Sequence, residues 1–337
     1  MYNFRSLICL LSIFTLLFGC KPTDKKENAL QVDTKVDIIS ENLDEQFLAA
    51  GSVEEVQKLL QKFPGFQQYY FSDFEGDSVQ LAQQLFSIYR NERFQEFKIQ
   101  VDSIIGNRDS TILAPLLAAF SNIKRNFPMF KAPKVVFMMS GFVGNDVYIS
   151  DSLLVIGLDY FGGSEASFRP NVFDYQLRRY QKEYIVPSVV YFMSERFNKS
   201  NPKDNTLLAE MIGIGKGFEF VRQVIPQCPD SLIIGYSGEN LRKTYNSQTE
   251  IWAYFITQKL IYEKNTLKKE KYIGERPFTI EVGNEVPGGI ARWIGWRIVS
   301  KYLEKHPDVT LSELMSTDNA PFLFEQSGYN GEKDEEE

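Results

Sequence analysis

The most apolar stretch of the sequence lies at its beginning and constrains everything after it. Leu7 to Phe18 is a run of twelve residues interrupted only by Ser12 and Thr15, and Arg5 is the one charge in the first nineteen positions. A short positive segment before such a run is typical of a secretory signal peptide. The run is too short for a membrane-spanning helix, and no later stretch is apolar enough for one. We therefore expect an exported globular protein.

The apolar run ends in Leu17-Phe18-Gly19-Cys20, which resembles the lipobox of bacterial lipoproteins. The resemblance implies that residues 1–19 are removed as a signal peptide and that Cys20 carries lipid. Each buried methylene of an acyl chain contributes about 0.8 kcal/mol, so lipid on Cys20 would hold the protein on a membrane. Residues 20–40 are polar, lack a helical stripe and are predicted to be a tether. The tether has no compact acidic cluster after Cys20, so we expect the protein to face the periplasm, and we favour the outer membrane as its anchor.

Cysteine and histidine are scarce. Cys9 leaves with the signal peptide and Cys20 is lipidated, so Cys228 has no partner for an intramolecular disulfide. His306 is the single histidine, which excludes a zinc site built from two or three imidazoles. A catalytic triad would have to use His306, but this residue precedes Pro307 at a predicted helix end. We expect no structural zinc and no cofactor.

Composition and charge narrow the class of protein further. The net charge is −7, and removal of residues 1–19, which contain one positive charge, makes it −8. A mildly acidic chain has no electrostatic basis for binding nucleic acid. The hydrophobic and aromatic fractions, 43% and 14%, are those of a globular protein. We found no internal repeat or long linker and expect one mixed domain over residues 41–330, followed by a disordered acidic tail over 331–337.

Hydrophobic periodicity predicts a chain dominated by helices, with one small sheet. Short apolar runs at 134–139, 147–149 and 153–158, the last two separated by a turn at Asp151, predict a partly antiparallel sheet near residues 134–158. The fold class is therefore α+β and predominantly helical. The predicted helical segments are 52–63, 78–88, 110–127, 187–197, 205–224, 247–260, 290–303 and a short one after Thr310.

A glycine series, Gly213-Ile214-Gly215-Lys216-Gly217, lies inside the predicted helix 205–224. A phosphate loop needs its glycines directly after a strand, at a helix N-terminus. Here they lie eight or more residues beyond the predicted cap. We therefore favour close helix packing as the reason for the glycines, since each costs about 1 kcal/mol of helix propensity.

Six stretches in the second half of the chain carry a family resemblance through their order and spacing. They are Val155–Tyr160, Arg178-Arg179-Tyr180 leading to Tyr184–Pro187, Ile233-Ile234-Gly235-Tyr236, Glu250-Ile251-Trp252, Arg276-Pro277-Phe278-Thr279 and Arg292–Val299. Together they resemble the gliding-motility-associated lipoprotein GldB family. The resemblance implies a cell-envelope role connected with gliding and with type IX secretion, with other envelope proteins as partners. The leading hypothesis is a non-enzymatic component of that apparatus.

A more distant resemblance concerns the order of an edge strand and the helices 187–197 and 205–224, which is similar to zinc peptidases of the zincin type. In such enzymes two histidines four residues apart share one helical face. The correspondence places Tyr191 and Glu195 at the histidine positions, Phe192 at the catalytic glutamate and Glu210 at the third ligand. It implies a peptidase-like scaffold that lacks the metal-binding histidines and the base.

Two alternatives from other classes remain open. One is an envelope hydrolase that uses carboxylates such as Asp159, Glu195 and Glu210. The other is a lipoprotein that binds a glycan or peptide in a cleft of the second half. Arg178-Arg179 could bind an anion, although a solvated surface is the favoured interpretation. The tryptophans Trp252, Trp293 and Trp296 are expected in the core, and an exposed patch of them would mark a partner surface.

Overall fold

The computed structural model describes residues 36–332. The predicted signal peptide, Cys20 and most of the predicted tether lie outside the described residues, as do residues 333–337. The described part contains a mixed sheet with the strand order β1-β2-β4-β3. Its strands are β1 (Ser40–Asn42), β2 (Lys134–Met138), β3 (Val147–Ile149) and β4 (Leu153–Gly157).

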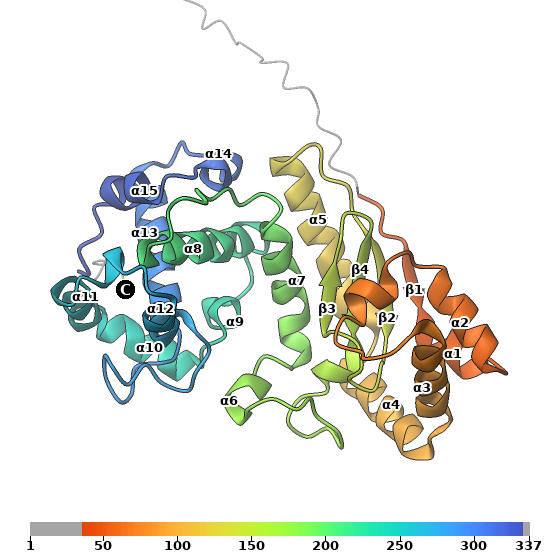
Figure 1. Cartoon of the computed structure of the whole chain (residues 1–337). Helices are drawn as coiled ribbons and strands as arrows, with labels where there is room; N and C mark the ends of the chain where they lie inside the picture. Colours follow the sequence, from red (N-terminus) through yellow and green to blue (C-terminus); the bar gives the residue numbers. More distant parts are fainter. Residues whose placement is uncertain (1–35, 333–337) are drawn as a thin grey trace, which may run out of the picture. The chain divides into compact units, whose positions relative to one another are not determined.

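The sheet is parallel except at one edge (Figure 1). β1 pairs with β2 and β2 with β4 in parallel, whereas β3 pairs with β4 in antiparallel. The predicted turn between β3 and β4 is closed by the amide of Ser150, which donates to the carbonyl of Leu153 at 2.7 Å. The three predicted strands are confirmed. β1 was not predicted, because Ser40-Glu41-Asn42 has no apolar pattern. These residues form a strand only because they pair with Val135 to Phe137.

Helices make up most of the remaining structure, so the predicted fold class is confirmed. α1, α3 and α5 lie in the part of the protein that contains the sheet. α8 and α13 pack against each other and form the centre of the second half of the chain (Figure 1). In chain order the α-helices are α1 (Leu43–Ala49), α2 (Val53–Gln61), α3 (Ser78–Arg90), α4 (Glu92–Ile105), α5 (Ala114–Asn126), α6 (Asp174–Leu177), α7 (Ile185–Ser194), α8 (Leu207–Val224), α9 (Asp230–Ile234), α10 (Gly238–Asn246), α11 (Gln248–Thr257), α12 (Thr266–Ile273), α13 (Ile290–Lys305), α14 (Leu311–Ser316) and α15 (Ala320–Ser327).

Helix starts follow local capping chemistry. Ser52 caps α2 by accepting from the Glu55 amide, and Thr310 forms a capping box with Glu313 at the start of α14. α3 is capped by Asp77, one residue before the predicted start, because the Asp77 carboxylate accepts from two amides of the first turn. Along residues 36–332, no helix combines the length and apolarity that a bilayer crossing requires.

The glycine series allows the backbones of α8 and α13 to touch. A Cβ atom at Gly215 would overlap the carbonyl group of Gly295, and one at Gly295 would overlap the carbonyl group of Met211. A Cβ at Gly217 would lie 2.8 Å from the ring of Tyr191 on α7, whereas one at Gly213 would meet nothing within 4 Å. The predicted close helix packing is therefore confirmed, and two of the three glycines in the series are needed for it.

Candidate functional site

A pocket of about 260 Å³ in the second half is lined by four arginines. They are Arg178 and Arg179 at the end of α6, Arg276 after α12, and Arg292 in the first turn of α13. The other walls come from the junction of α9 and α10 and from the loop that precedes α13. The arginines are separated by up to 114 positions in the sequence, so only the fold brings them together.

Four of the six stretches that carry the family resemblance contribute to this pocket. Arg178 and Arg179 come from one of them, and Tyr236, Arg276 and Arg292 from three others. The sequence alone favoured a solvated surface for the arginine pair. The structure instead places both residues, half-buried, in a concave site together with two further arginines.

Backbone contacts fix the walls of the pocket. The buried Tyr236 donates its hydroxyl to the carbonyl of Gly288 at 2.9 Å. A Cβ at Gly288 would overlap the carbonyl of Arg276, so a larger residue cannot occupy this position without moving the wall. Thr279 donates its hydroxyl to the carbonyl of Pro287 at 2.8 Å and closes the loop between these segments. Rigid support of this kind is what a binding site needs.

Glu275 neutralises one arginine and ties α6 to the segment after α12. Its Oε1 lies 2.8 Å from Nε of Arg179, and its Oε2 accepts from the side-chain Nε2 of Gln176 at 3.1 Å. Its backbone carbonyl accepts from the Tyr175 hydroxyl at 3.1 Å. Arg179 also donates to the carbonyl of Ile234 at 3.1 Å. The carboxylate of Glu275 is thus satisfied by protein groups.

The remaining arginines divide into one paired and two unpaired side chains. Arg276 contacts both carboxylate oxygens of Glu281, at 3.2 and 3.0 Å. Arg178 donates through Nε to the Tyr184 hydroxyl at 3.1 Å, and Arg292 donates through Nε to the backbone carbonyl of Ile273. Neither Arg178 nor Arg292 has a carboxylate partner among residues 36–332. Burial, and next the charge of Arg179, lower the pKa of Arg292.

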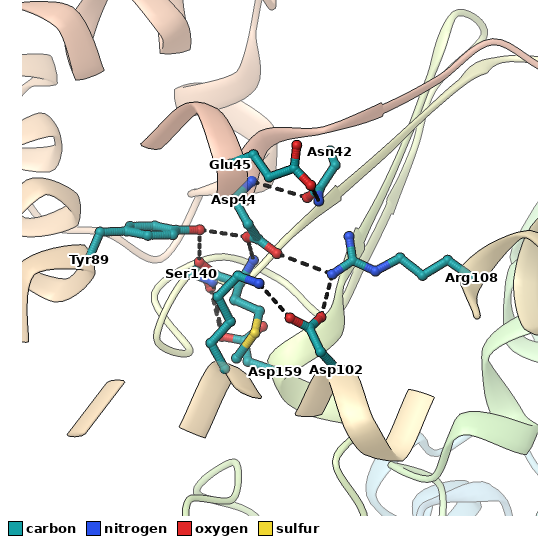
Figure 2. A network of polar contacts seen from close by, with 10 residues as sticks. Asn42, Asp44, Glu45, Tyr89, Asp102, Arg108, Ser140 and Asp159 are labelled. Atoms are coloured by element: carbon teal, nitrogen blue, oxygen red, sulfur yellow. Dashed lines mark hydrogen bonds and ion pairs between the residues drawn. The ribbon is translucent and has the colours of Figure 1, made fainter. Parts of the chain in front are cut away.

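A second polar cluster lies at the carboxyl ends of the parallel strands (Figure 2). The fully buried Asp44 accepts from the Tyr89 hydroxyl and from the Met139 amide, both at 2.7 Å. Its other oxygen faces Arg108 at 3.6 Å, beyond hydrogen-bond distance. Arg108 is held in turn by Asp102 at 2.5 Å. Burial raises the pKa of Asp44 against the lowering effect of these donors.

Asp159 completes this cluster. Its Oδ2 accepts from the amides of Ser140 and Phe142 at 3.0 and 2.8 Å, and its Oδ1 is buried without a hydrogen bond. Burial and the nearby Asp44 charge raise the pKa of Asp159 to about 6. Although carboxyl ends of parallel strands often bind ligands, Asp44 and Asp159 are 0% and 1% exposed. The cluster therefore connects strand ends inside the protein and offers no surface to a substrate.

The residues matched to zincin ligands occupy the expected elements but have separate partners. α7 lies against the edge strand β3 and against α8. Tyr191 packs on the ring of Phe218 with centroids 5.2 Å apart, Phe192 is 42% exposed, and Glu195 is exposed after the last turn of α7. Glu210 forms an ion pair with Lys269 of α12. Within residues 36–332, no three His, Cys, Asp or Glu side chains are grouped to hold a metal.

The three tryptophans lie in the interior. Trp252, Trp293 and Trp296 are 7%, 0% and 2% exposed. Trp296 donates its indole N–H to the buried Glu219 at 3.2 Å, and Trp252 packs against Tyr329 with ring centroids 5.1 Å apart. They serve packing and form no exposed patch that a partner could contact.

Comparison with known proteins defines the class as a gliding-motility-associated lipoprotein. The sequence model of the family described as gliding motility protein GldB matches residues 23–331, which is most of the chain. No curated protein and no solved structure matches the chain, and the likeness to zincins therefore stays unconfirmed. The chain belongs to the GldB family.

Proposed function

We propose that the protein is a non-enzymatic, lipid-anchored component of the gliding and type IX secretion apparatus. The observation that carries this proposal is the family match over residues 23–331. Lipid on Cys20 would hold the protein on a membrane, facing the periplasm and anchored in the outer membrane, where it would contact other envelope proteins. Placement next to those proteins, and no chemical step, would be its contribution.

The side chains at the four zincin-like positions, Tyr191, Phe192, Glu195 and Glu210, support a non-enzymatic role. A tyrosine and a phenylalanine stand where the scaffold would need an imidazole and a general base, and Tyr191 is engaged in aromatic packing. A carboxylate hydrolase is less well supported, because it needs two acids that face one substrate. Asp159 is enclosed beside Asp44, whereas Glu210 is paired with Lys269. A ligand-binding lipoprotein is the better alternative, since the arginine pocket presents unpaired charged groups to a ligand.

Deletion of the gene tests the proposal. Loss of colony spreading, together with loss of type IX cargo from the medium, is the expected result. Restoration by a plasmid copy of the wild-type gene is the control for polar effects on neighbouring genes. A deletion strain that spreads and secretes normally would contradict the proposed function.

A further inference from the structure

We propose that the arginine pocket binds a phosphate group, carried by a small soluble molecule or by a lipid headgroup. The inference goes beyond the proposed function and does not depend on it. It rests on the unequal pairing of the four arginines. Two of them form ion pairs with Glu275 and Glu281, whereas Arg178 and Arg292 form no ion pair with a described residue.

The charge of the pocket fits a dianion. An ionised group held partly out of water without an ion-pair partner is costly. Arg292 forms no ion pair with a described residue, and the like charge of Arg179 acts on it more strongly than the opposite charge of Glu275. A phosphate monoester carries about −1.5 to −2 charges at neutral pH, which would compensate two guanidinium groups. A single carboxylate would compensate one. Asp174 also lines the pocket, but it is exposed, so solvent and salt screen its charge.

The donors of the pocket fit phosphate oxygens as well. Guanidinium groups bind phosphate through paired N–H donors, and the Nε atoms of Arg178 and Arg292 are already fixed by Tyr184 and Ile273. This leaves the terminal Nη atoms of both side chains available to a ligand. Ser237, which caps α10 by accepting from the Asn240 amide at 2.9 Å, lines the same pocket and can donate its hydroxyl proton.

The size of the pocket limits what enters it. About 260 Å³ is below the roughly 300–1,000 Å³ of sites that enclose drug-sized ligands. The volume suits a phosphate with a few attached carbon atoms. We therefore expect glycerol 3-phosphate to be a better probe than a nucleotide, and any longer chain of the ligand to remain outside.

Calorimetric titration of the full mature lipoprotein in detergent, at fixed ionic strength, tests the proposal. The probes are inorganic phosphate, glycerol 3-phosphate and succinate. Saturable binding of glycerol 3-phosphate is expected, with succinate at least tenfold weaker. R178Q and R292Q should each weaken glycerol 3-phosphate binding at least tenfold. R292K should weaken it too, because lysine keeps the charge but loses the planar fork.

Arg242 provides the matched control. It is exposed on α10 and does not line the pocket, so R242Q should bind like the wild type. A thermal unfolding midpoint within a few degrees of the wild type shows that a weakened variant is still folded. Unchanged binding in both R178Q and R292Q, no saturable binding of either phosphate probe, or equal binding of succinate would overturn the proposal.

Dioctanoyl phosphatidic acid distinguishes the two sources of the phosphate group. Tighter binding than glycerol 3-phosphate, lost in R178Q, would assign a lipid headgroup. Equal or weaker binding would assign a soluble phosphate compound. Neither result depends on motility, so failure of phosphate binding and failure of the proposed envelope function are seen in different experiments.

Discussion

The side chains of Arg179 and Glu275 are joined by an ion pair with an Nε–Oε1 distance of 2.8 Å, which connects α6 with the segment after α12. E275Q keeps the shape of the side chain but removes its charge. Because both groups are about one third exposed, we expect a loss of about 1 kcal/mol or less in the free energy of unfolding. The freed charge of Arg179 should strengthen glycerol 3-phosphate binding several-fold. Urea unfolding and calorimetry measure the two effects, and weaker binding would contradict this view of the pocket.

The crossing of α8 and α13 offers a matched pair of glycine substitutions. G215A should destabilise the protein by about 1–3 kcal/mol, since its methyl group would overlap the backbone at Gly295. G213A lies on the same helix, meets nothing within 4 Å, and should be neutral or stabilise by up to about 1 kcal/mol through helix propensity. Chemical unfolding of both variants is the measurement. Equal effects of the two substitutions would show that the helices are not in backbone contact.

Stability should depend on the ionisation of Asp159. The pKa of this carboxyl group is raised from 3.8 to about 6 in the folded protein, so the folded state binds its proton more tightly than the unfolded state does. The resulting stabilisation is fully present below about pH 4 and is lost as the pH rises through 6. Its size is on the order of 3 kcal/mol. D159N cannot ionise and should lack this contribution.

Urea unfolding of the wild type and D159N between pH 4 and pH 8 measures the difference. Groups that do not interact with Asp159 titrate alike in both proteins, and the comparison removes their effect. The free energy of unfolding of the wild type should fall relative to that of D159N as the pH rises. Parallel pH profiles would show that Asp159 is not the titrating group.

Cys20 is predicted to be the membrane attachment point. C20S should leave the protein in the soluble periplasmic fraction, or as an uncleaved precursor, because it removes the proposed lipid attachment. Fractionation followed by immunoblotting measures this. Protease treatment of intact cells reports the side of the membrane: prompt digestion of the wild-type protein would show a surface location and contradict the periplasmic assignment.

Strands β2, β3 and β4 were predictable, because local patterns mark them, and the glycine series indicated a close helix contact without naming its partner. β2 and β4 are buried runs between turn residues. β1 was not predictable in the same way, since its polar residues become a strand only by pairing with a segment some 95 positions later. α4 was missed although Phe94, Phe97, Val101 and Ile105 give it a buried stripe.

The arginine pocket shows what sequence patterns leave open. Arg178 and Arg179 were recognised as a possible anion site, but their convergence with Arg276 and Arg292 depends on tertiary contacts. Glu275 and Tyr236, which hold the walls together, gave no chemical signal. The stretches that carry the family resemblance contain residues of the pocket, but only the folded structure shows that these residues line one site.

Complementation of a deletion strain tests most directly whether the protein works without catalysis. The strain would express wild-type protein or the double variant E195A/E210A. This variant removes the two carboxylates at the zincin-like positions and leaves Asp159 intact. Immunoblotting confirms equal amounts of membrane-bound protein. We predict wild-type colony spreading and type IX secretion from the double variant. Loss of both in a strain with normal levels of folded protein would contradict a non-enzymatic role.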